Sequence, residues 1–342
     1  MRTAILAIIL FTLLIIPHEF GHFIAARKFD VKVNEFSFGM GPKLWSKEKG
    51  ETLFSLRLIP IGGFCALEGE DGENDNPRAF SNKKPWQKLV ILAAGAIMNM
   101  ITALVILFAI YVIGGQTTKV IGDVTFNSPS YEAGIVKGDV VQYVDDNKVK
   151  EWSEIGSYIA KKEGKEVSIT VKRGKESLTF NLTPDKEEVL DENGEVIGYR
   201  YVVGIVSKVT HNPILAVSTS VESAIDMVGI TYQSLAMLFT GDASIKDLAG
   251  PIGVVQIVDE TKSYGFSSFL LIVALLAVNI GLVNLLPFPA LDGGRILFVL
   301  IAIITKKKIS EKTEATINAI GLILLLALAA IVAGNDISRL LG

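Results

Sequence analysis

The sequence predicts a polytopic α-helical membrane protein with about four transmembrane helices, a cytoplasmic membrane-associated β-hairpin region and one extracytoplasmic α+β domain. Three observations support this fold class. Half of the 342 residues are hydrophobic and only 20% are charged, whereas soluble proteins usually carry about a quarter charged residues. The hydrophobic residues are concentrated in long runs without charge. Between two of these runs lies a stretch of short β-rich segments separated by Gly, Asp and Asn residues.

Charge and cysteine content exclude several other classes of protein. The formal net charge is −3, whereas proteins that bind nucleic acid usually carry a basic surplus, so we expect no nucleic-acid partner. The single cysteine, Cys65, cannot form an internal disulfide, which excludes a disulfide-stabilised secreted scaffold. The high aliphatic content excludes a disordered chain.

Four uncharged runs are long enough to cross a lipid bilayer, which requires roughly 20 apolar residues in a helix. They cover residues 3–17 (continued to residue 26 after a short polar interruption), 89–113, 265–291 and 315–334. We expect the first run to be a retained span rather than a cleaved signal peptide, because no small-x-small cleavage site follows it.

The basic residues orient these spans. Lys and Arg are concentrated between the first and second runs and again after the third, so the positive-inside rule places these two segments in the cytoplasm and both termini outside. Residues 114–264 are then exported. A fifth uncharged run, residues 227–241, is short and follows Glu222 and Asp226; it is predicted to be an amphipathic helix on the membrane surface.

Within the exported segment, residues 119–206 predict a small α+β domain. The expected strands are near residues 140–144, 167–171, 178–182 and 201–205, with a helix over residues 153–162. The domain resembles a PDZ domain of the bacterial protease type in the order of Ser128-Pro129, Ala133-Gly134-Ile135, Gly138-Asp139-Val140-Val141, Trp152 and Leu182-Thr183-Pro184. PDZ domains bind extended peptides by strand addition at a sheet edge; the alternative is a spacer or a steric plug.

A candidate metal site lies in the first span, in the motif His18-Glu19-Phe20-Gly21-His22. Residues four apart share one face of a helix, so both imidazoles can reach the same ion, and Glu19 can contact a water bound to that ion. Ionisable groups are costly within a membrane and usually serve a function there. The alternative is a cluster that snorkels to the helix end. His211, in a polar turn, is predicted to be an ordinary surface histidine.

Catalytic zinc needs a third protein ligand, and Asp292 is the strongest candidate. Pro287 and Pro289 precede it and cannot lie inside a regular helix, so they predict a break at membrane depth. The alternative is a simple helix end with Asp292 as a cap. Four crossings place Asp292 on the same side as His18, whereas a fifth crossing at residues 227–241 would separate them by about 30 Å. The four-span topology is therefore preferred.

Together these features resemble the site-2 protease family of intramembrane zinc metalloproteases, in its bacterial RseP/RasP-like branch with one PDZ domain. The resemblance covers essentially the whole chain. It is carried by the HExxH motif, the PDZ-like domain, the segment from Asn284 to Gly294, and three further matches: Phe38-Gly39-Met40-Gly41-Pro42, Pro60-Ile61-Gly62-Gly63-Phe64 and Gly250-Pro251-Ile252-Gly253.

The resemblance implies a role for each motif residue. His18, His22 and Asp292 would bind Zn²⁺, Glu19 would be the catalytic base, and Asn284 would bind substrate. The family often has Gly-Pro-x-x-Asn in the second span, where this chain has Gly95-Ala96-Ile97-Met98-Asn99. Asn99 is therefore a further candidate for substrate binding, although Ala96 replaces the proline.

The cytoplasmic loop after the first span predicts a β-hairpin. Residues 51–58 alternate in polarity, residues 60–63 form a turn, and residues 64–67 are apolar. In the family such hairpins approach the active site, where an edge strand could hold an unwound substrate. The alternative is an ordinary cytoplasmic hairpin. The predicted domains are residues 1–117, 118–207, 208–264 and 265–342.

These observations predict an intramembrane zinc endopeptidase in the bacterial inner (cytoplasmic) membrane, with its active site near the cytoplasmic side. The resemblance implies that it cleaves single-span membrane proteins already trimmed by another protease, such as anti-sigma factors or remnant signal peptides. The alternatives are a non-catalytic metal-binding membrane scaffold or adaptor, which would not need Glu19, and a metal transporter. A transporter would need polar residues in several spans, and residues 315–334 are almost featureless.

Overall fold

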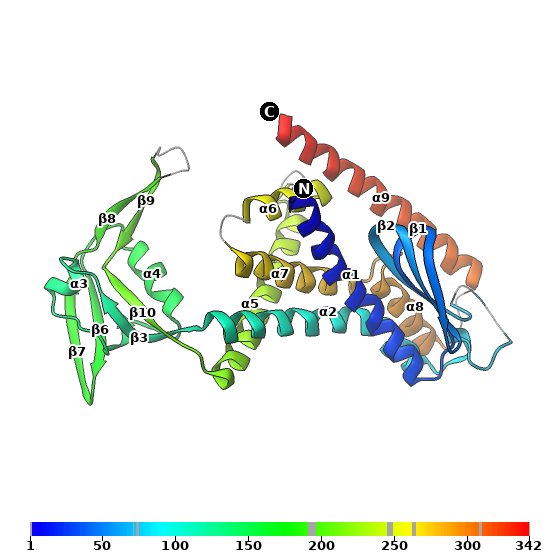
Figure 1. The fold of residues 1–342 in the computed structure, drawn as a ribbon, viewed down its shortest axis with the longest axis horizontal. Helices are drawn as coiled ribbons and strands as arrows, with labels where there is room; N and C mark the ends of the chain where they lie inside the picture. The colour runs from blue at the N-terminus through cyan, green and yellow to red at the C-terminus, as the bar shows by residue number, and fades with distance from the viewer. Residues whose placement is uncertain are drawn as a thin grey trace. The chain divides into compact units, whose positions relative to one another are not determined.

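The computed structural model describes residues 2–70, 72, 75–190, 196–244, 249–261, 265–307 and 310–341. The chain divides into two compact units (Figure 1). The helical unit comprises Met1–Ile110 and Ser218–Gly342, and the β-rich unit comprises Tyr111–Val217. The expected domain boundary at residue 264 lies outside the described residues.

The long helices of the structure follow the hydrophobic runs. They are α1 (Arg2–Lys28), α2 (Pro85–Gly114), α5 (Pro213–Thr240), α7 (Phe266–Asn284) and α9 (Glu311–Leu341), with the shorter α6 (Pro251–Thr261) and α8 (Asp292–Thr305) between them. Among the described residues, five helices are long and apolar enough to cross a membrane: Ile5–Lys28, Pro85–Gly114, Pro213–Leu238, Phe266–Asn284 and Lys312–Arg339. Four of these correspond to the predicted spans.

The fifth helix, α5, is longer than predicted. It begins at Pro213 rather than near residue 227, because Asn212 caps its first turn by accepting hydrogen bonds from the backbone N–H groups of Ile214 and Leu215 at 3.0 and 3.4 Å. In the second half of α5, the Thr231 hydroxyl hydrogen-bonds the side chain of Asn279 on α7. Figure 1 shows α5 running across α7 rather than alongside it.

The third predicted span is interrupted, as its two prolines indicate. Helix α7 ends at Asn284 and α8 starts at Asp292. The intervening backbone lies so close to α8 that a Cβ on Gly293 would be 2.1 Å from the Leu286 carbonyl oxygen, so glycine is required there. The chain resumes as α8 after this interruption, which agrees with the predicted break and not with the alternative of a simple helix end.

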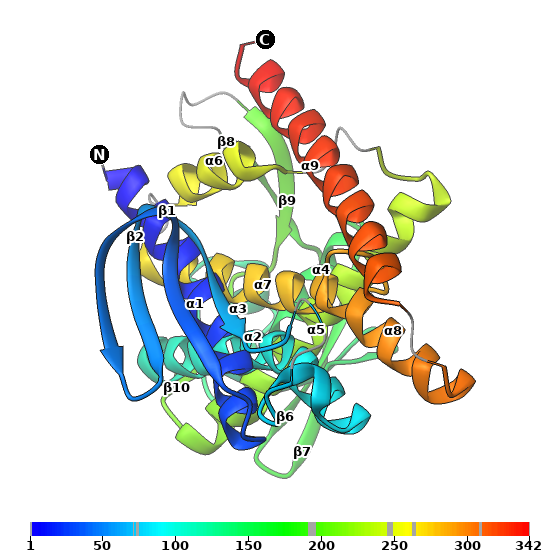
Figure 2. The same cartoon turned by 90° about the vertical axis from the view of Figure 1, so that its right-hand side faces the viewer.

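The hairpin after α1 is larger than predicted and its pairing is different. Two long strands, β1 (Val33–Lys49) and β2 (Thr52–Leu67), form the sheet beside α1 (Figure 2). Residues 51–58 and 64–67, the two arms of the predicted hairpin, do not pair with each other. Instead β1 pairs with both, and Phe36 pairs with Phe54 on one side and with Cys65 on the other. A positive φ of +95° at Gly62 allows the bend in β2 that this arrangement needs.

The sheet is fixed to the helices by an apolar cluster at one end. Its buried members come from the end of α1, the turn that follows it, the start of β1, the end of β2, the 3₁₀ turn Phe80–Asn82 and α2: Ala25, Ala26, Val31, Val33, Cys65, Leu67, Phe80, Ile91 and Leu92. This cluster holds residues 63–67 of β2 beside the C-terminal half of α1, where the HExxH motif lies.

Helix α6 is held against α9 by a buried carboxylate. Asp336 of α9 is 1% exposed and accepts hydrogen bonds from the backbone N–H groups of Gly250 and Gly253 at 3.3 and 2.9 Å. Side chains at these two positions would collide with that carboxylate. The two glycines of the Gly250-Pro251-Ile252-Gly253 motif are therefore needed to let α9 cap the start of α6.

The β-rich unit contains a sheet with the strand order β10-β3-β4-β6-β7, in which β5 pairs with β4, and a separate pair β8–β9. The strands are β3 (Gln116–Val124), β4 (Val140–Val144), β5 (Asn147–Lys148), β6 (Val167–Arg173), β7 (Glu176–Leu182), β8 (Asp185–Leu190), β9 (Val196–Val202) and β10 (Ile205–Thr210). Its helices are α3 (Pro129–Glu132) and α4 (Trp152–Ala160). Three predicted strands and the predicted helix are present.

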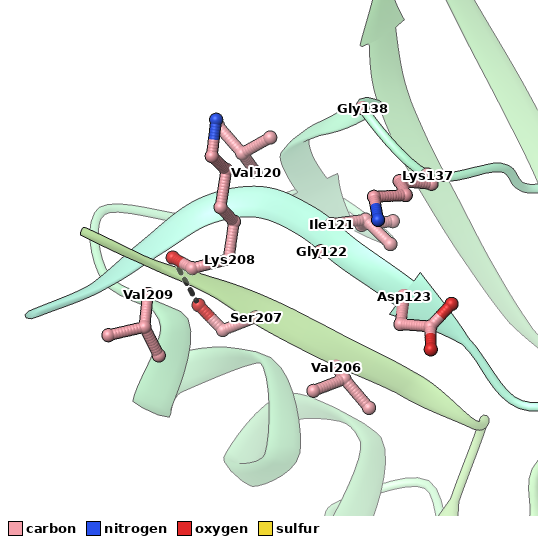
Figure 3. Close-up of a pocket in the computed structure, with 10 residues that line it drawn as sticks. All are labelled: Val120, Ile121, Gly122, Asp123, Lys137, Gly138, Val206, Ser207, Lys208 and Val209. Carbon is pink, nitrogen blue, oxygen red and sulfur yellow. Dashed lines mark hydrogen bonds between the residues drawn. The ribbon is translucent and has the colours of Figure 1, made fainter.

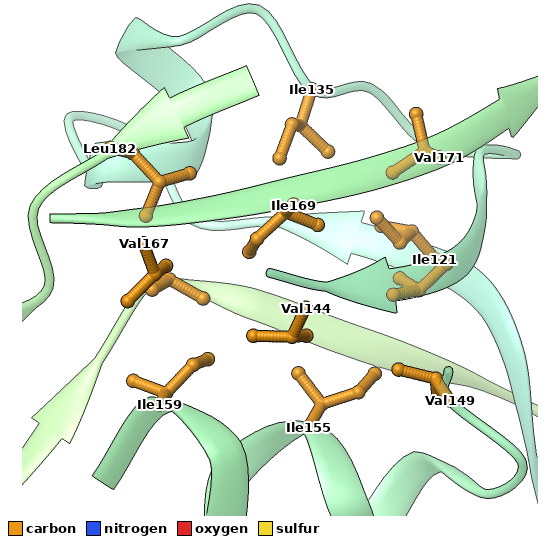
Figure 4. Close-up of a cluster of buried hydrophobic side chains, with 12 residues drawn as sticks. Ile121, Ile135, Val144, Val149, Ile155, Ile159, Val167, Ile169, Val171 and Leu182 are labelled. Carbon is orange, nitrogen blue, oxygen red and sulfur yellow. The ribbon is translucent and has the colours of Figure 1, made fainter. Parts of the chain in front are cut away.

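The predicted strand at residues 201–205 is wrong. Gly204 has a φ of +78°, so the run is divided between the end of β9 and the start of β10. Ile155 and Ile159 of α4 pack with Val144 and Ile169 in the buried core of the unit (Figure 4). This closed aliphatic core accounts for the stability of the unit.

Candidate metal centre and active site

His18 and His22 lie one turn apart on α1 and face the same point. Their Nε2 atoms are 3.3 Å apart and their rings meet edge to face. The 3.6-residue period of the helix produces this juxtaposition without help from the rest of the fold.

Asp292, the first residue of α8, completes a triangle with the two histidines. Its Oδ2 atom is 3.2 Å from Nε2 of His18 and 3.4 Å from Nε2 of His22. Zinc bonds of about 2.0–2.1 Å at tetrahedral angles place neighbouring ligand atoms about 3.3–3.4 Å apart. The three atoms therefore have the spacing of three ligands to one tetrahedral ion. Asp292 does not cap α8, for which Leu291 is the cap residue.

The chemistry of the three donors also fits a cation. Among the described residues, none donates a hydrogen bond of good geometry to the buried Oδ2 of Asp292. Such an orphaned oxygen is costly unless an ion or a water satisfies it. His22 has a fixed tautomer, because its Nδ1 lies 2.9 Å from the backbone carbonyl of Ile91. A carbonyl only accepts, so Nδ1 holds the ring proton and Nε2 offers its lone pair to a metal.

Two glycines bring α2 close enough to form the wall of this centre. A Cβ on Gly95 would lie 2.3 Å from Nε2 of His22 and 2.8 Å from Nε2 of His18. A Cβ on Gly21, between the histidines, would lie 2.2 Å from the backbone oxygen of Ala94. Any larger residue at these positions would separate the helices or fill the space between the ligand atoms.

Glu19 lies beside the triangle rather than in it, since the only clustered metal-binding side chains found in the described chain are His18, His22 and Asp292. The backbone of Cys65 on β2 hydrogen-bonds the Glu19 carboxylate. The Cγ of Glu19 is 3.7 Å from where a Cβ on Gly63 would stand. The sheet thus passes directly alongside this carboxylate.

The two predicted asparagines lie on opposite sides of His18. Asn284, the last residue of α7, places Nδ2 3.5 Å from Nε2 of His18, next to the triangle. Asn99 of α2 places Nδ2 3.5 Å from Nδ1 of the same ring and is 0% exposed. His211 is exposed and belongs to the β-rich unit.

Sequence reasoning missed the contributions of Ile91, Gly95 and Cys65. Ile91 and Cys65 act through their backbones, which leave no signature in residue type. Gly95 does leave one: it stands four residues before Asn99, so a helix places both on the face that meets the histidines. The Arg295–Glu70 ion pair, which ties α8 to the segment after β2, was also not foreseen.

A concavity of about 440 Å³ lies in the β-rich unit along β3 and β10 (Figure 3). Its lining includes Lys137 and Lys208, with Asp123 near the end of β3, and contains no histidine or cysteine. It offers charged and apolar surface without the donor set of a catalytic centre.

Comparison with known proteins identifies relatives along the whole chain. Peptidase family M50 matches residues 6–328. A provisionally named zinc metalloprotease of Clostridium perfringens is 35% identical, covering 97% of this chain and 98% of its own length. The regulator of sigma-W protease RasP of Bacillus subtilis is 30% identical, with 99% of both chains covered. Zinc metalloprotease RasP of Oceanobacillus iheyensis is 28% identical, with 99% of this chain covered.

Among solved structures, the PDZ domain of an SdrC-like protein from Listeria monocytogenes is 22% identical, covers 26% of this chain and 84% of its own, and has a TM-score of 0.21. The family match and the full-length relatives determine the assignment. This chain belongs to peptidase family M50, the site-2 protease family of zinc metalloproteases.

Proposed function

We propose that His18, His22 and Asp292 bind the catalytic zinc and that the protein cleaves peptide bonds within membrane-spanning substrates. The observation that carries this proposal is the triangle of Nε2, Nε2 and Oδ2 atoms with sides of 3.2–3.4 Å. When bound there, zinc supplies Lewis acidity and lowers the pKa of a coordinated water. Three protein ligands leave the fourth tetrahedral position open for that water.

Glu19 acts as the general base. It follows His18 directly but stays outside the ligand triangle, so its carboxylate is free to take a proton. The backbone contact with Cys65 restrains its orientation. Asn284 holds the substrate, since its amide N–H group reaches the same edge of the triangle and can donate to the carbonyl of the scissile bond.

The substrate segment pairs with β2 while its backbone is unwound. A helical substrate hides its carbonyls in i→i−4 hydrogen bonds, so it must open before it is cut. Residues 63–66 of β2 pair with β1 on one side only, and in the described part of the chain no other strand pairs with their second edge. The backbone of Cys65 in this segment hydrogen-bonds the Glu19 carboxylate, so a substrate strand added to β2 here would bring its carbonyls close to the base.

The membrane topology that agrees with this chemistry has four crossings, in the bacterial cytoplasmic membrane. Helices α1, α2, α9 and the interrupted α7–α8 pair cross, while α5 lies across α7, touching it through Thr231 and Asn279. The triangle then lies near the cytoplasmic side, and the β-rich unit is an exported PDZ-type domain. We propose that it excludes substrates with bulky ectodomains, so that only trimmed proteins are cut.

This topology has a direct test by cysteine accessibility. With Cys65 replaced, a cysteine at Asn147 should react with an impermeant maleimide added outside intact cells, whereas cysteines at Lys47 and Lys307 should react only after permeabilisation. Labelling at Lys307 from outside intact cells would mean that the number of crossings is wrong.

The substrates are expected to be membrane-bound regulators such as anti-sigma factors, or remnant signal peptides. Support comes from the Bacillus subtilis relative, whose name is regulator of sigma-W protease. A scaffold that only binds metal is the alternative, but it has no need of a carboxylate beside the ligands.

The test is cleavage of a panel of tagged single-span proteins by wild type and by Glu19→Gln in the same membranes. The amide cannot accept the proton of water, so Glu19→Gln should lose about 10²–10⁴-fold in rate while keeping its zinc. Cleavage within tenfold of wild type would reject the general-base role. Retention of zinc, measured by elemental analysis, separates loss of chemistry from loss of the site.

A further inference from the structure

The two histidines of the triangle are held by different kinds of group. His22 presents Nδ1 to the backbone carbonyl of Ile91 at 2.9 Å. His18 presents Nδ1 to the side-chain amide of Asn99 at 3.5 Å. One histidine is thus oriented by the main chain and the other by a side chain that mutation can change.

The Asn99 amide is buried and only partly satisfied. The residue is 0% exposed, and among the described residues its Oδ1 has no hydrogen-bond partner. A neutral imidazole that offers Nε2 to a metal carries its proton on Nδ1. With Nδ2 facing that nitrogen, two donors would meet; a half-turn of the amide about Cβ–Cγ brings the unpartnered Oδ1 to the same place.

We propose that Asn99 is a positioning residue that accepts a hydrogen bond from Nδ1 of His18 through Oδ1. This rests on the proposed binding of zinc by Nε2 of His18. The contact holds the proton on Nδ1 and orients the ring, as metal-ligating histidines generally require. It replaces the substrate-binding role expected from the sequence.

The packing around Asn99 supports a role behind the ligand rather than in contact with substrate. Gly281 of α7 packs on it: a Cβ there would lie 3.5 Å from Cβ of Asn99 and 3.1 Å from the backbone oxygen of Ala96. Asn99 is therefore enclosed between α1 and α7. Asn284, one turn after Gly281, lies on the other side of His18, beside Asp292.

The experiment compares zinc affinity in Asn99→Leu, Asn99→Asp and Asn284→Ala, with His18→Ala as reference. The full-length protein is purified in detergent and titrated against a competing chelator, and the visible spectrum of the Co²⁺-substituted form is recorded. Removing the acceptor should weaken zinc binding about 10–100-fold in Asn99→Leu and alter the Co²⁺ bands. Aspartate accepts from Nδ1–H, so Asn99→Asp should bind zinc within about threefold of wild type or more tightly.

The outcomes separate this inference from the function on which it rests. Asn284→Ala should keep the wild-type zinc affinity, since that amide faces the substrate. If Asn99→Leu binds zinc as tightly as wild type, or if Asn99→Asp is as weak as Asn99→Leu in folded protein, Asn99 does not position His18. Wild-type affinity in His18→Ala would instead overturn the metal centre itself.

Discussion

Each unit of the molecule contains an aspartate with a buried carboxylate oxygen that lies beside basic side chains, and the two carboxylates differ in how fully they are hydrogen-bonded. In the β-rich unit, Asp139 is 1% exposed at its side chain, and both of its carboxylate oxygens are satisfied. Arg173 donates to Oδ1 and Oδ2 at 2.8 Å, and the backbone N–H of Val136 donates to Oδ2 at 3.0 Å. In the helical unit, Asp292 lies beside two imidazoles, and no residue that the structure describes hydrogen-bonds its Oδ2 atom.

The difference in hydrogen bonding separates a structural carboxylate, which stabilises the fold, from a functional carboxylate, which is available to bind an ion. A fully hydrogen-bonded buried acid stabilises its surroundings, and removing it leaves its partner unpaired. An incompletely satisfied one costs stability unless an ion binds, so it marks a functional site. Asp336, which accepts two backbone N–H groups, belongs with Asp139 in the first class.

The largest loss of zinc affinity is expected from a substitution that fills the space between the ligand atoms. In Gly95→Ala the new Cβ would lie 2.3 Å from Nε2 of His22, so zinc affinity should fall by more than about 100-fold as the helices separate or the ligands turn away. Gly156→Ala, in α4 of the β-rich unit, is the matched control because nothing lies within 4 Å of its Cβ. It should keep zinc and stabilise its helix by about 0.5–1 kcal/mol. Chelator competition measures the zinc affinity, and hydrogen exchange measures the stability of α4. Equal zinc affinity in both variants would show that the metal centre does not need glycine at position 95.

A smaller effect is expected from Asp139→Asn, measured by hydrogen exchange of β6 in the full-length protein. Burial acts to raise the pKa of Asp139, but hydrogen bonds from Arg173 and Val136 outweigh it and hold that pKa below its usual value. Its stabilisation is therefore present above the unfolded pKa of about 3.9 and is lost as the pH falls through the lower, folded pKa.

At neutral pH this substitution should cost about 1–3 kcal/mol, and the gap to wild type should close on acidification below about pH 4. Zinc content should stay at the wild-type level. A constant gap across that range would show that the charge of Asp139 is not what stabilises the unit.

The grouping of His18, His22 and Asp292 could be predicted from the sequence because the signals for it are local. His18 and His22 follow from the helical period, and Asp292 follows from a proline-marked break at membrane depth. The pairing of β1 could not be foreseen in this way. Residues 40–49 are all exposed in that strand, and their polarity does not alternate along the sequence. The full length of α5 could not be predicted because Glu222 and Asp226 resemble the boundary of a helix. Its actual start depends on the cap that Asn212 provides.

The contacts that orient the centre were the least predictable. Ile91 and Cys65 act through backbone groups, which every residue has, so the sequence does not single them out. Ile91 reaches His22 only because α1 and α2 cross closely at Gly21 and Gly95. Asn99 was identified as a candidate, but its position behind His18 depends on packing with Gly281, which no local pattern encodes.

The most direct test of the central claim is the zinc content of Asp292→Ala beside wild type and Asp139→Asn, each purified as the full chain and dialysed against a weak chelator. Wild type and Asp139→Asn should each retain one zinc per chain. Asp292→Ala should retain far less than one, because two imidazoles alone do not complete a catalytic zinc site. Full zinc occupancy in Asp292→Ala would remove Asp292 from the metal centre and contradict this account.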